Sequence, residues 1–438
     1  MPLRPSGFME YSPSEQLIFD QLVEIIKKNY EKFWYTHIHT PAVEANSVLL
    51  AKNGEEAGKQ IFGLYGLAQG TDDLKDYSLH FDLTVPFARY VLDRESELTF
   101  PFKRYQIQPA RRGERAQRGR FREFFQCDID VIRRKDAGKS YLFYDAEVMF
   151  NSLITLQEIL KAMEIDDIPR VHISNRKLLA GFLLNIVSEH QLQPVSTLID
   201  KFQKIWLDNF ILSLQDLGLS SQQTQKIVDF VQYKVDLAGL DAILDRSPHP
   251  LFAQGIEELK EVLLTLQQLQ QGFGVQVPYE VDFQIVRGLD YYTGTVFETP
   301  LEKDPKLWSI CSGGSYENLT GHIDPKKDFY AGVGGSIGMS RLLAKIFEEK
   351  KTTQNTVTEY LFLHFPETLL ETYTIAGKLS DQGKNIEIYP TADKLGKQFW
   401  YADKKGIPFV VILGEGEKKQ GIYKVKNMQT GEETTEKL

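Results

Sequence analysis

The stretch FKRYQIQPARRGERAQRGRFREFFQCDIDVI, residues 102–132, decides the fold class because it predicts two strands that flank a basic loop. Residues 102–108 and 121–132 have the aromatic and alternating composition of strands. Gly113 and Gly119 interrupt the arginine-rich segment between them. An antiparallel hairpin with a long loop is therefore expected.

The second of these strands carries polar side chains on one face. Period-two alternation places Gln126, Asp128 and Asp130 on one side and Cys127 and Ile129 on the other. The Cα atoms of Gln126 and Asp130 are separated by roughly 13 Å, and inward-reaching side chains shorten this gap to about the length of an amino acid. An aspartate that faces a pocket implies a cationic or N–H-rich ligand.

The hairpin is also a positive segment within an acidic protein. The formal net charge of −9 argues against indiscriminate nucleic-acid binding. Residues 103–134 nevertheless contain ten Lys and Arg residues against four Asp and Glu residues. Guanidinium groups bind phosphate oxygens bidentately, so the segment predicts a nucleoside triphosphate as ligand. A solvated basic hairpin explains the same residues about equally well.

Length and composition set the broad class. The 438 residues are enough for two or three domains, and 42% hydrophobic with 25% charged residues is typical of a soluble globular protein. No apolar run approaches the roughly 20 residues that span a bilayer, and no secretory signal is recognisable. Cys127 and Cys311 are too few for a disulfide framework or a cysteine-based metal site. A cytoplasmic protein without a membrane segment is predicted.

Helices and strands follow from spacing and capping. Ser12 and Glu15 form a capping box that starts a helix through about Tyr30. Residues 185–271, in which Ser220 with Gln223 forms a second capping box, predict an all-helical insertion. Amphipathic spacing predicts a further helix over 145–161, and another helix is expected over 336–349. The remaining strands of this part are expected at residues 279–286, 295–299 and 308–311.

The last part of the chain alternates strands with helices. Residues 348–356 are polar and mark a linker. The alternation beyond the linker predicts a compact α/β domain. Its strands are expected at residues 360–365, 385–389 and 409–413, and its helices at 367–382 and 395–405.

Three glycine-bearing segments contain further candidate site residues. They are RGLDYYTGTVFE at 287–298, CSGGSY at 311–316 and GVGGSIGMSRL at 332–342. Glycine lets a backbone turn sharply or approach a ligand closely. The third segment lacks the Walker lysine and the spacing of a dinucleotide fingerprint. Taken singly, residues 287–298 are explained better as a turn between two strands, and the other two segments are weak signals.

Taken in order, the four segments resemble the signature motifs of the histidyl-tRNA synthetases, a class II aminoacyl-tRNA synthetase family. Residues 287–298 resemble the histidine-recognition motif, 103–132 the second class II motif and 336–342 the third, while Thr40-Pro41 stands where the first motif has its dimer-interface proline. The resemblance covers essentially the whole chain and implies an α+β fold. The implied parts are an antiparallel-sheet catalytic domain over 1–347 with the helical insertion at 185–271, a linker over 348–356, and an anticodon-binding α/β domain over 357–438.

The resemblance also implies a reaction and its participants. L-Histidine is activated with ATP and Mg²⁺ to histidyl-adenylate and transferred to tRNA(His) by a cytoplasmic homodimer. Implied ATP contacts are Arg112 and Arg287 at the α-phosphate, Glu114 near the adenine and Arg341 at the γ-phosphate. Implied histidine contacts are Asp82, Thr84 and Gln126 at the α-amino group, Arg112 at the carboxylate, Asp130 and Tyr292 at the imidazole, and Tyr291 and Tyr316 along its pocket. Arg287 is also implied as a histidine-binding residue.

Three other interpretations stay open at this point. A class II synthetase for threonine, proline or glycine has the same fold, although residues 287–292 and Asp130 speak against it. The synthetase-like regulatory subunit of histidine biosynthesis typically lacks the anticodon-binding domain, whereas residues 360–438 are present here. A nucleotide-binding module without catalysis is the third. The sequence departs from the family pattern at Ser315, where many members carry arginine, and at Ser340, where glutamate is frequent.

Overall fold

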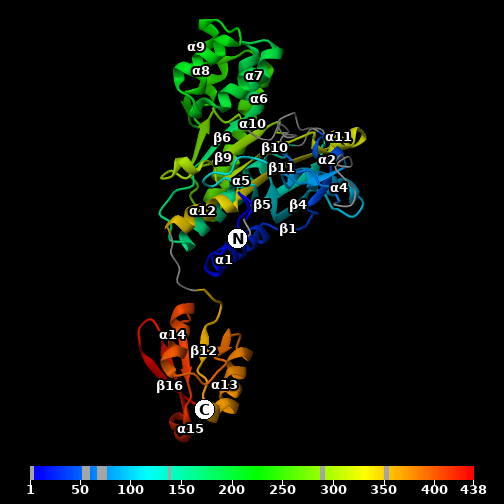
Figure 1. Cartoon of the computed structure of the whole chain (residues 1–438). Helices are drawn as coiled ribbons and strands as arrows, with labels where there is room; N and C mark the ends of the chain where they lie inside the picture. Colours follow the sequence, from blue (N-terminus) through cyan, green and yellow to red (C-terminus); the bar gives the residue numbers. More distant parts are fainter. Residues whose placement is uncertain (1–3, 52–59, 67–75, 137–139, 287–291, 350–354) are drawn as a thin grey trace. The chain divides into compact units, whose positions relative to one another are not determined.

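The computed structural model describes residues 4–51, 60–66, 76–136, 140–286, 292–349 and 355–438. It divides into two compact units (Figure 1). The first contains Met1–Met9 and Val23–Ile346, and the second contains Glu10–Leu22 and Phe347–Leu438.

A nine-stranded sheet forms the centre of the first unit. Its strand order is β1-β4-β5-β11-β10-β9-β6-β8-β7, and neighbours are antiparallel except for the parallel pairs β1/β4 and β6/β8. The strands are β1 (Thr36–His37), β4 (Phe102–Arg111), β5 (Glu123–Arg134), β6 (Val171–Asn175), β7 (Lys234–Val235), β8 (Tyr279–Asp282), β9 (Thr295–Thr299), β10 (Cys311–Tyr316) and β11 (Tyr330–Gly338).

The hairpin expected over residues 102–132 is confirmed as β4 and β5. Its register pairs Arg104 with Asp130 and Gln108 with Gln126. On its other side β5 pairs with β11, which places Gly334 opposite Asp130. β5 therefore lies between the long strands β4 and β11, and its polar side chains lie on one face of the sheet, away from its edges.

Helices cover this sheet and a smaller one. α5 lies against β5, β10 and β11 on one side and against α10 on the other, and most of its residues are buried. The prediction of a helix over 145–161 is confirmed, but the prediction that one face of it is exposed to solvent is wrong, because the helix is buried on most sides. The two-stranded sheet consists of β2 (Val43–Ala45) and β3 (Tyr77–Leu79). The helices here are α2 (Asn46–Leu49), α4 (Thr84–Asp93), α5 (Phe143–Ala162) and α11 (Leu319–Ile323). Two further helices, α1 (Pro13–Lys32) and α12 (Met339–Glu349), contain residues of both units.

The two predicted capping boxes are present. Ser12 and Glu15 exchange backbone-to-side-chain hydrogen bonds of 2.7 and 3.4 Å at the start of α1. Ser220 and Gln223 do the same at the start of α9. The predicted insertion is mainly helical, but β7 within it adds an edge strand to the large sheet by pairing with β8. The helices of this region are α6 (Arg176–Leu184), α7 (Glu189–Asp200), α8 (Leu207–Asp216), α9 (Ser221–Val231) and α10 (Pro250–Phe273).

One predicted strand and one predicted helix begin at later residues than expected, because glycine-rich segments form strands there. The strand expected at 308–311 begins at Cys311 instead and runs through the paired glycines to Tyr316. The helix expected from Ser336 begins at Met339, because β11 continues to Gly338. A Cβ atom on Gly313 would lie 2.1 Å from the carbonyl oxygen of Gly334. The glycines are needed because these strands pack too closely for side chains.

The second unit has a five-stranded sheet in the order β13-β12-β14-β15-β16. The expected alternation of strands and helices is confirmed, whereas the C-terminal hairpin β15–β16 and α15 were not expected. Leu361, Val410 and Ala402 form part of one core, and Phe362, Ile375 and Val411 form part of another. The elements are β12 (Tyr360–Phe362), α13 (Leu369–Asp381), β13 (Ile386–Ile388), α14 (Leu395–Lys405), β14 (Phe409–Ile412), α15 (Glu415–Gln420), β15 (Ile422–Asn427) and β16 (Glu433–Lys437).

Among the described residues of both units, we find no helix whose length and apolar character would let it span a bilayer.

Candidate active site

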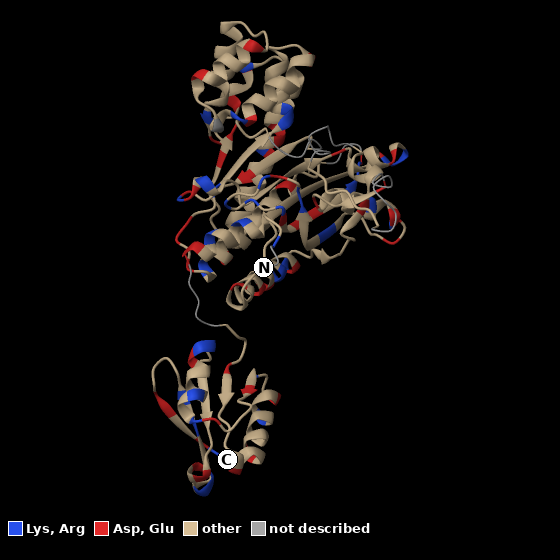
Figure 2. Cartoon of the chain, viewed as in Figure 1, with Lys and Arg blue, Asp and Glu red and all other residues tan. Residues whose placement is uncertain are grey.

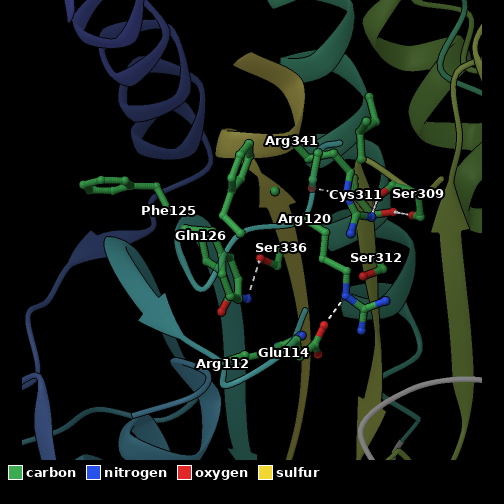
Figure 3. Close-up of a pocket in the computed structure, with 15 residues that line it drawn as sticks. Arg112, Glu114, Arg120, Phe125, Gln126, Ser309, Cys311, Ser312, Ser336 and Arg341 are labelled. Atoms are coloured by element: carbon green, nitrogen blue, oxygen red, sulfur yellow. Dashed lines mark hydrogen bonds and ion pairs between the residues drawn. The ribbon is translucent and has the colours of Figure 1, made fainter. Parts of the chain in front are cut away.

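An open pocket lies over the polar face of the hairpin (Figure 3). β5, the basic loop, β10, β11 and the first turn of α12 supply its walls. Four residues predicted for the site line it: Arg112, Glu114, Gln126 and Arg341. The structure thus brings together side chains from three separate stretches of the chain.

Arg112 is held in place at the wall of this pocket. Its Nε atom donates a 3.0 Å hydrogen bond to the carbonyl oxygen of Phe81. Its guanidinium carbon lies 5.1 Å from the ring centroid of Phe124, a cation–π distance. A planar cation fixed in this way is suited to bidentate binding of a carboxylate or phosphate.

Arg341 occupies the opposite wall. Its Nε atom donates to the carbonyl oxygen of Gly119 at 3.1 Å, and its Nη1 atom donates to the carbonyl oxygen of Ser309. These bonds link α12 to the basic loop and to the segment before β10. The neighbouring residue Ser340 accepts a 2.9 Å hydrogen bond from the backbone N–H of Phe125. The serine that departs from the family pattern therefore ties α12 to β5.

Asp130 lies below the pocket and is 1% exposed. Its Oδ2 atom pairs with Arg104 at 2.6 Å, and its Oδ1 atom accepts a 2.9 Å hydrogen bond from the hydroxyl of Tyr316. Burial raises the pKa of Asp130 to about 7, while Arg104 and Tyr316 lower it and the nearby Asp128 and Asp82 raise it. The carboxylate is thus held in a fixed orientation by two partners.

Sequence reasoning missed the role of Arg104. We expected it to belong to the phosphate-binding segment, but its side chain is fully buried and lies 4.5 Å from the ring centroid of Phe87. It also donates to Gln106 at 3.2 Å. The hairpin register, in which Arg104 stands opposite Asp130, was the available signal.

Other cations of the segment are also committed to ion pairs. Blue basic and red acidic residues are both scattered over this unit in Figure 2, without one large single-coloured region. These five cations are neutralised singly, whereas Arg112 lines the pocket, so the prediction that the segment binds a nucleoside triphosphate stays a prediction. The pairs are Lys103 with Glu147 at 2.5 Å, Arg111 with Glu123 at 2.8 Å, Arg118 with Asp304 at 2.7 Å, Arg134 with Glu95 at 3.9 Å, and Arg120 with Glu114.

Asp82 and Thr84 stand where β3 leads into α4. Asp82 is 1% exposed and accepts a 3.1 Å hydrogen bond from the backbone N–H of Val85. Burial raises its pKa to about 6, while that hydrogen bond and Arg112 lower it. Thr84 is the first residue of α4 and is also buried. Asp82 follows Phe81, whose carbonyl oxygen accepts the hydrogen bond from Arg112 at the pocket wall.

The tyrosines predicted for the imidazole pocket are only partly described. Tyr316 is buried, and Tyr292 is partly buried against the same hydrophobic core. A Cβ atom on Gly314 would lie 2.6 Å from the backbone carbonyl oxygen of Thr295 and 3.0 Å from the Tyr292 ring, so glycine is required there. The predictions for Arg287 and Tyr291 lie outside the described residues.

A mainly antiparallel sheet with helices on it, and arginines from the second and third motifs at one pocket, defines a class II aminoacyl-tRNA synthetase catalytic domain. The comparisons with known proteins agree. The family model for histidyl-tRNA synthetase matches residues 7–342, and the model for an anticodon binding domain matches residues 366–438. The chain belongs to the histidyl-tRNA synthetase family.

Curated relatives carry the same description. The chain is 40% identical over 440 residues to the histidine–tRNA ligase of Clostridium tetani, covering 99% of this chain and 95% of the relative. It is also 40% identical over 452 residues to that of Stenotrophomonas maltophilia, covering 98% and 94%. The chain therefore activates histidine and charges tRNA(His) for translation, and ATP is its second substrate.

Solved structures support the fold. The histidyl-tRNA synthetase from Nostoc sp. PCC 7120 matches with a TM-score of 0.87 at 36% identity, over 99% of this chain and 96% of that one. A structure from Bacillus halodurans described as an ATP phosphoribosyltransferase regulatory subunit/histidyl-tRNA synthetase matches with a TM-score of 0.73 over 90% and 94%. Its 18% identity shows a shared fold alone.

Proposed function

We propose that the pocket binds ATP, and that histidine lies beneath it along β5. The observation that carries this proposal is the convergence of Arg112, Gln126 and Arg341 on one pocket. In the family pattern Arg112 contacts the α-phosphate and the histidine carboxylate. Glu114 contacts the adenine region, and Arg341 binds the γ-phosphate.

Histidine is assigned to the buried polar face next to the pocket. The fixed carboxylate of Asp130 supports this assignment, because a preorganised acceptor suits an imidazole N–H. The assigned contacts are Asp82, Thr84 and Gln126 for the α-amino group, Asp130 and Tyr292 for the imidazole, and Tyr291 and Tyr316 for the walls of its slot.

The proposed chemistry needs positive charge rather than a general base. The histidine carboxylate attacks the α-phosphorus, a new P–O bond forms, and pyrophosphate leaves with the electrons of the broken P–O bond. Two anionic groups repel each other, and Arg112 neutralises both, with Arg287 acting from the other side in the family pattern. The terminal ribose hydroxyl of the tRNA then attacks the mixed anhydride and releases AMP.

We propose that Mg²⁺ enters with the triphosphate. Within the described ranges, no three His, Cys, Asp or Glu side chains are grouped so as to hold a metal ion. Magnesium in nucleotide sites is commonly held mainly by phosphate oxygens and water, with few protein carboxylates. The residues present therefore fit an ion carried by ATP, whose charge would offset that of the phosphates.

We also propose the domain limits, the assembly and the location. Catalysis is assigned to residues 1–347 with the insertion at 185–271, and anticodon recognition to 357–438 after the linker at 348–356. The expected interface proline, Pro41, supports a homodimer, as do the exposed side chains of Val43 and Leu50 close to it in the chain and of Tyr77, which stands opposite Ala45 in the β2–β3 pair. The role of the enzyme in protein synthesis supports a cytoplasmic location.

Histidine-dependent pyrophosphate exchange tests the site assignments. Arg112→Ala should abolish exchange, and Asp130→Ala should raise the KM for histidine far more than the KM for ATP. Arg118→Ala is the matched control, because Arg118 is on the same loop but pairs with Asp304. Near-normal exchange in Arg112→Ala, with Arg118→Ala unaffected, would refute the assignment. Exchange stimulated by an amino acid other than histidine would refute the proposed imidazole slot.

A further inference from the structure

Asp128 is a buried carboxylate to which the proposed mechanism gives no role. It lies on β5 between Gln126 and Asp130, and period-two alternation gives the three residues the same face. The sheet register pairs it with Gln106 on β4 and with Ser336 on β11. Its side chain is 2% exposed, and Ser336 lines the ATP pocket beside it. Asp128 therefore stands at the boundary between the pocket and the buried face.

Ser336 links Asp128 to Gln126 and leaves one acceptor on each of them. The Nε2 atom of Gln126 donates to the hydroxyl of Ser336 at 3.1 Å (Figure 3). The hydroxyl of Ser336 in turn hydrogen-bonds to the Asp128 carboxylate. The Oε1 atom of Gln126 and the Oδ1 atom of Asp128 are both buried and have no hydrogen-bond partner among the described residues. Buried acceptors are normally paired, so these two atoms call for a donor.

A buried carboxylate is satisfied best by a charged donor. Burial raises the pKa of Asp128, whereas Arg104, the hydrogen bond from Ser336 and Arg112 lower it. Arg104 is bound to Asp130 at 2.6 Å. Arg112 donates to the carbonyl oxygen of Phe81 at 3.0 Å and Arg104 to that of Leu83 at 3.4 Å, so Asp82 is held against the hairpin that carries Asp128. The charge of Asp128 accordingly raises the pKa of Asp82. A single ammonium group between them would relieve this repulsion.

We propose that Asp128 is a further substrate-binding residue, which holds the α-ammonium group of histidine together with Asp82 and the Oε1 atom of Gln126. The inference rests on the proposed position of the amino group at Asp82. An ammonium group has three N–H donors, and these three side chains offer an acceptor for each. Asp128 thus supplies a second carboxylate to the amino-group site.

Substrate analogues separate this role from a structural one. L-Histidinol keeps the amine and the imidazole but lacks the carboxylate, and imidazolepropionate lacks the amine. Asp128→Asn should raise the KM for histidine and the Ki for histidinol by about 10- to 100-fold, because a charge-assisted hydrogen bond is lost. The Ki for imidazolepropionate and the KM for ATP should stay near their wild-type values. All four constants come from histidine-dependent pyrophosphate exchange.

Two outcomes would overturn the inference. Equal weakening of histidinol and imidazolepropionate would mean that Asp128 only supports the shape of the pocket. An unchanged Ki for histidinol would mean that Asp128 does not contact the amine. If Asp128→Asn fails to fold, Ser336→Ala carries the same test, because it removes the hydroxyl that orients both acceptors. It should give a smaller loss that is again confined to ligands with an amine, and a loss shared by both analogues would refute the role.

Asp82→Asn distinguishes a failure of this inference from a failure of the proposed function. An amine-selective loss in Asp82→Asn without one in Asp128→Asn refutes the role of Asp128 alone. If neither variant is amine-selective, the proposed position of the amino group is itself wrong.

Discussion

Gly334→Ala tests whether the imidazole is recognised at Asp130. Gly334 stands opposite Asp130 in the sheet, and a Cβ atom added to it would lie 2.2 Å from Oδ1 of Asp130. The carboxylate is bonded to Arg104 at 2.6 Å and to Tyr316 at 2.9 Å. Ordinary van der Waals contact begins near 3.4 Å, so the carboxylate of Asp130 must move away from the new methyl group. A movement of this size would break or distort its hydrogen bonds to Arg104 and Tyr316.

The expected magnitude follows from the cost of overpacking. Such a collision costs about 1–3 kcal/mol. If this cost falls on the orientation of Asp130, the KM for histidine in pyrophosphate exchange rises by about 5- to 150-fold at saturating ATP. The KM for ATP should stay close to the wild-type value, because Arg112 and Arg341 line a pocket that does not include Asp130.

Gly335→Ala is the matched control on the other face of the same strand. A Cβ atom there would lie 2.9 Å from Val148 and 3.1 Å from Ser152, both on α5. It should lower the urea midpoint of unfolding about as much as Gly334→Ala, yet leave the KM for histidine unchanged. Equal effects of the two variants on that KM would refute the placement of the imidazole at Asp130.

Arg341→Gln should raise the KM for ATP by about 10- to 100-fold with little change in the KM for histidine, as initial rates of pyrophosphate exchange would show. Arg104→Met should lower the free energy of unfolding by about 3–5 kcal/mol in urea, because Asp130 stays buried without its cation. Burial raises the pKa of Asp145 from 3.8 to about 6, so the folded chain holds a proton that the unfolded chain releases. The stability from this proton is present below about pH 4 and is lost as the pH rises through about 6, so Asp145→Asn should flatten the fall of the urea midpoint over that range. Truncation after Thr356 should impair charging of tRNA(His) more than histidine activation, and equal losses would contradict separate roles for the two units.

The hairpin was predictable because its signal is local. Alternation along β5 gives the face of each side chain, and two arginine-rich ends with glycines between them indicate a loop. From the faces alone, Gln126 and Asp130 could be assigned to one site. The positions of Arg112 and Arg341 on opposite walls of one pocket depend on long-range pairing, which no local pattern contains.

The glycine-rich strands were not predictable in the same way. Glycine is depleted in strands, so residues 311–316 and 332–338 resemble turns when read alone. In the fold, β10 and β11 need glycine because a neighbouring backbone, the Phe297 ring and the Asp130 carboxylate fill the space of a side chain. These segments form strands because of the residues that pack against them in the fold, and the local sequence does not contain that information.

Because Arg104 pairs with Asp130, the selection of histidine does not depend on an unpaired carboxylate. A buried carboxylate without a partner would reject an apolar amino acid, because the acceptor would stay unpaired. Asp130 is instead bonded to Arg104 and Tyr316 in the described chain, so each oxygen has one partner before any substrate binds. Carboxylate oxygens have a second lone pair, and the two fixed bonds decide where it points. Selectivity at Asp130 then arises from the direction of a preorganised acceptor, whereas the unpaired acceptors of Gln126 and Asp128 favour a group that every amino acid carries.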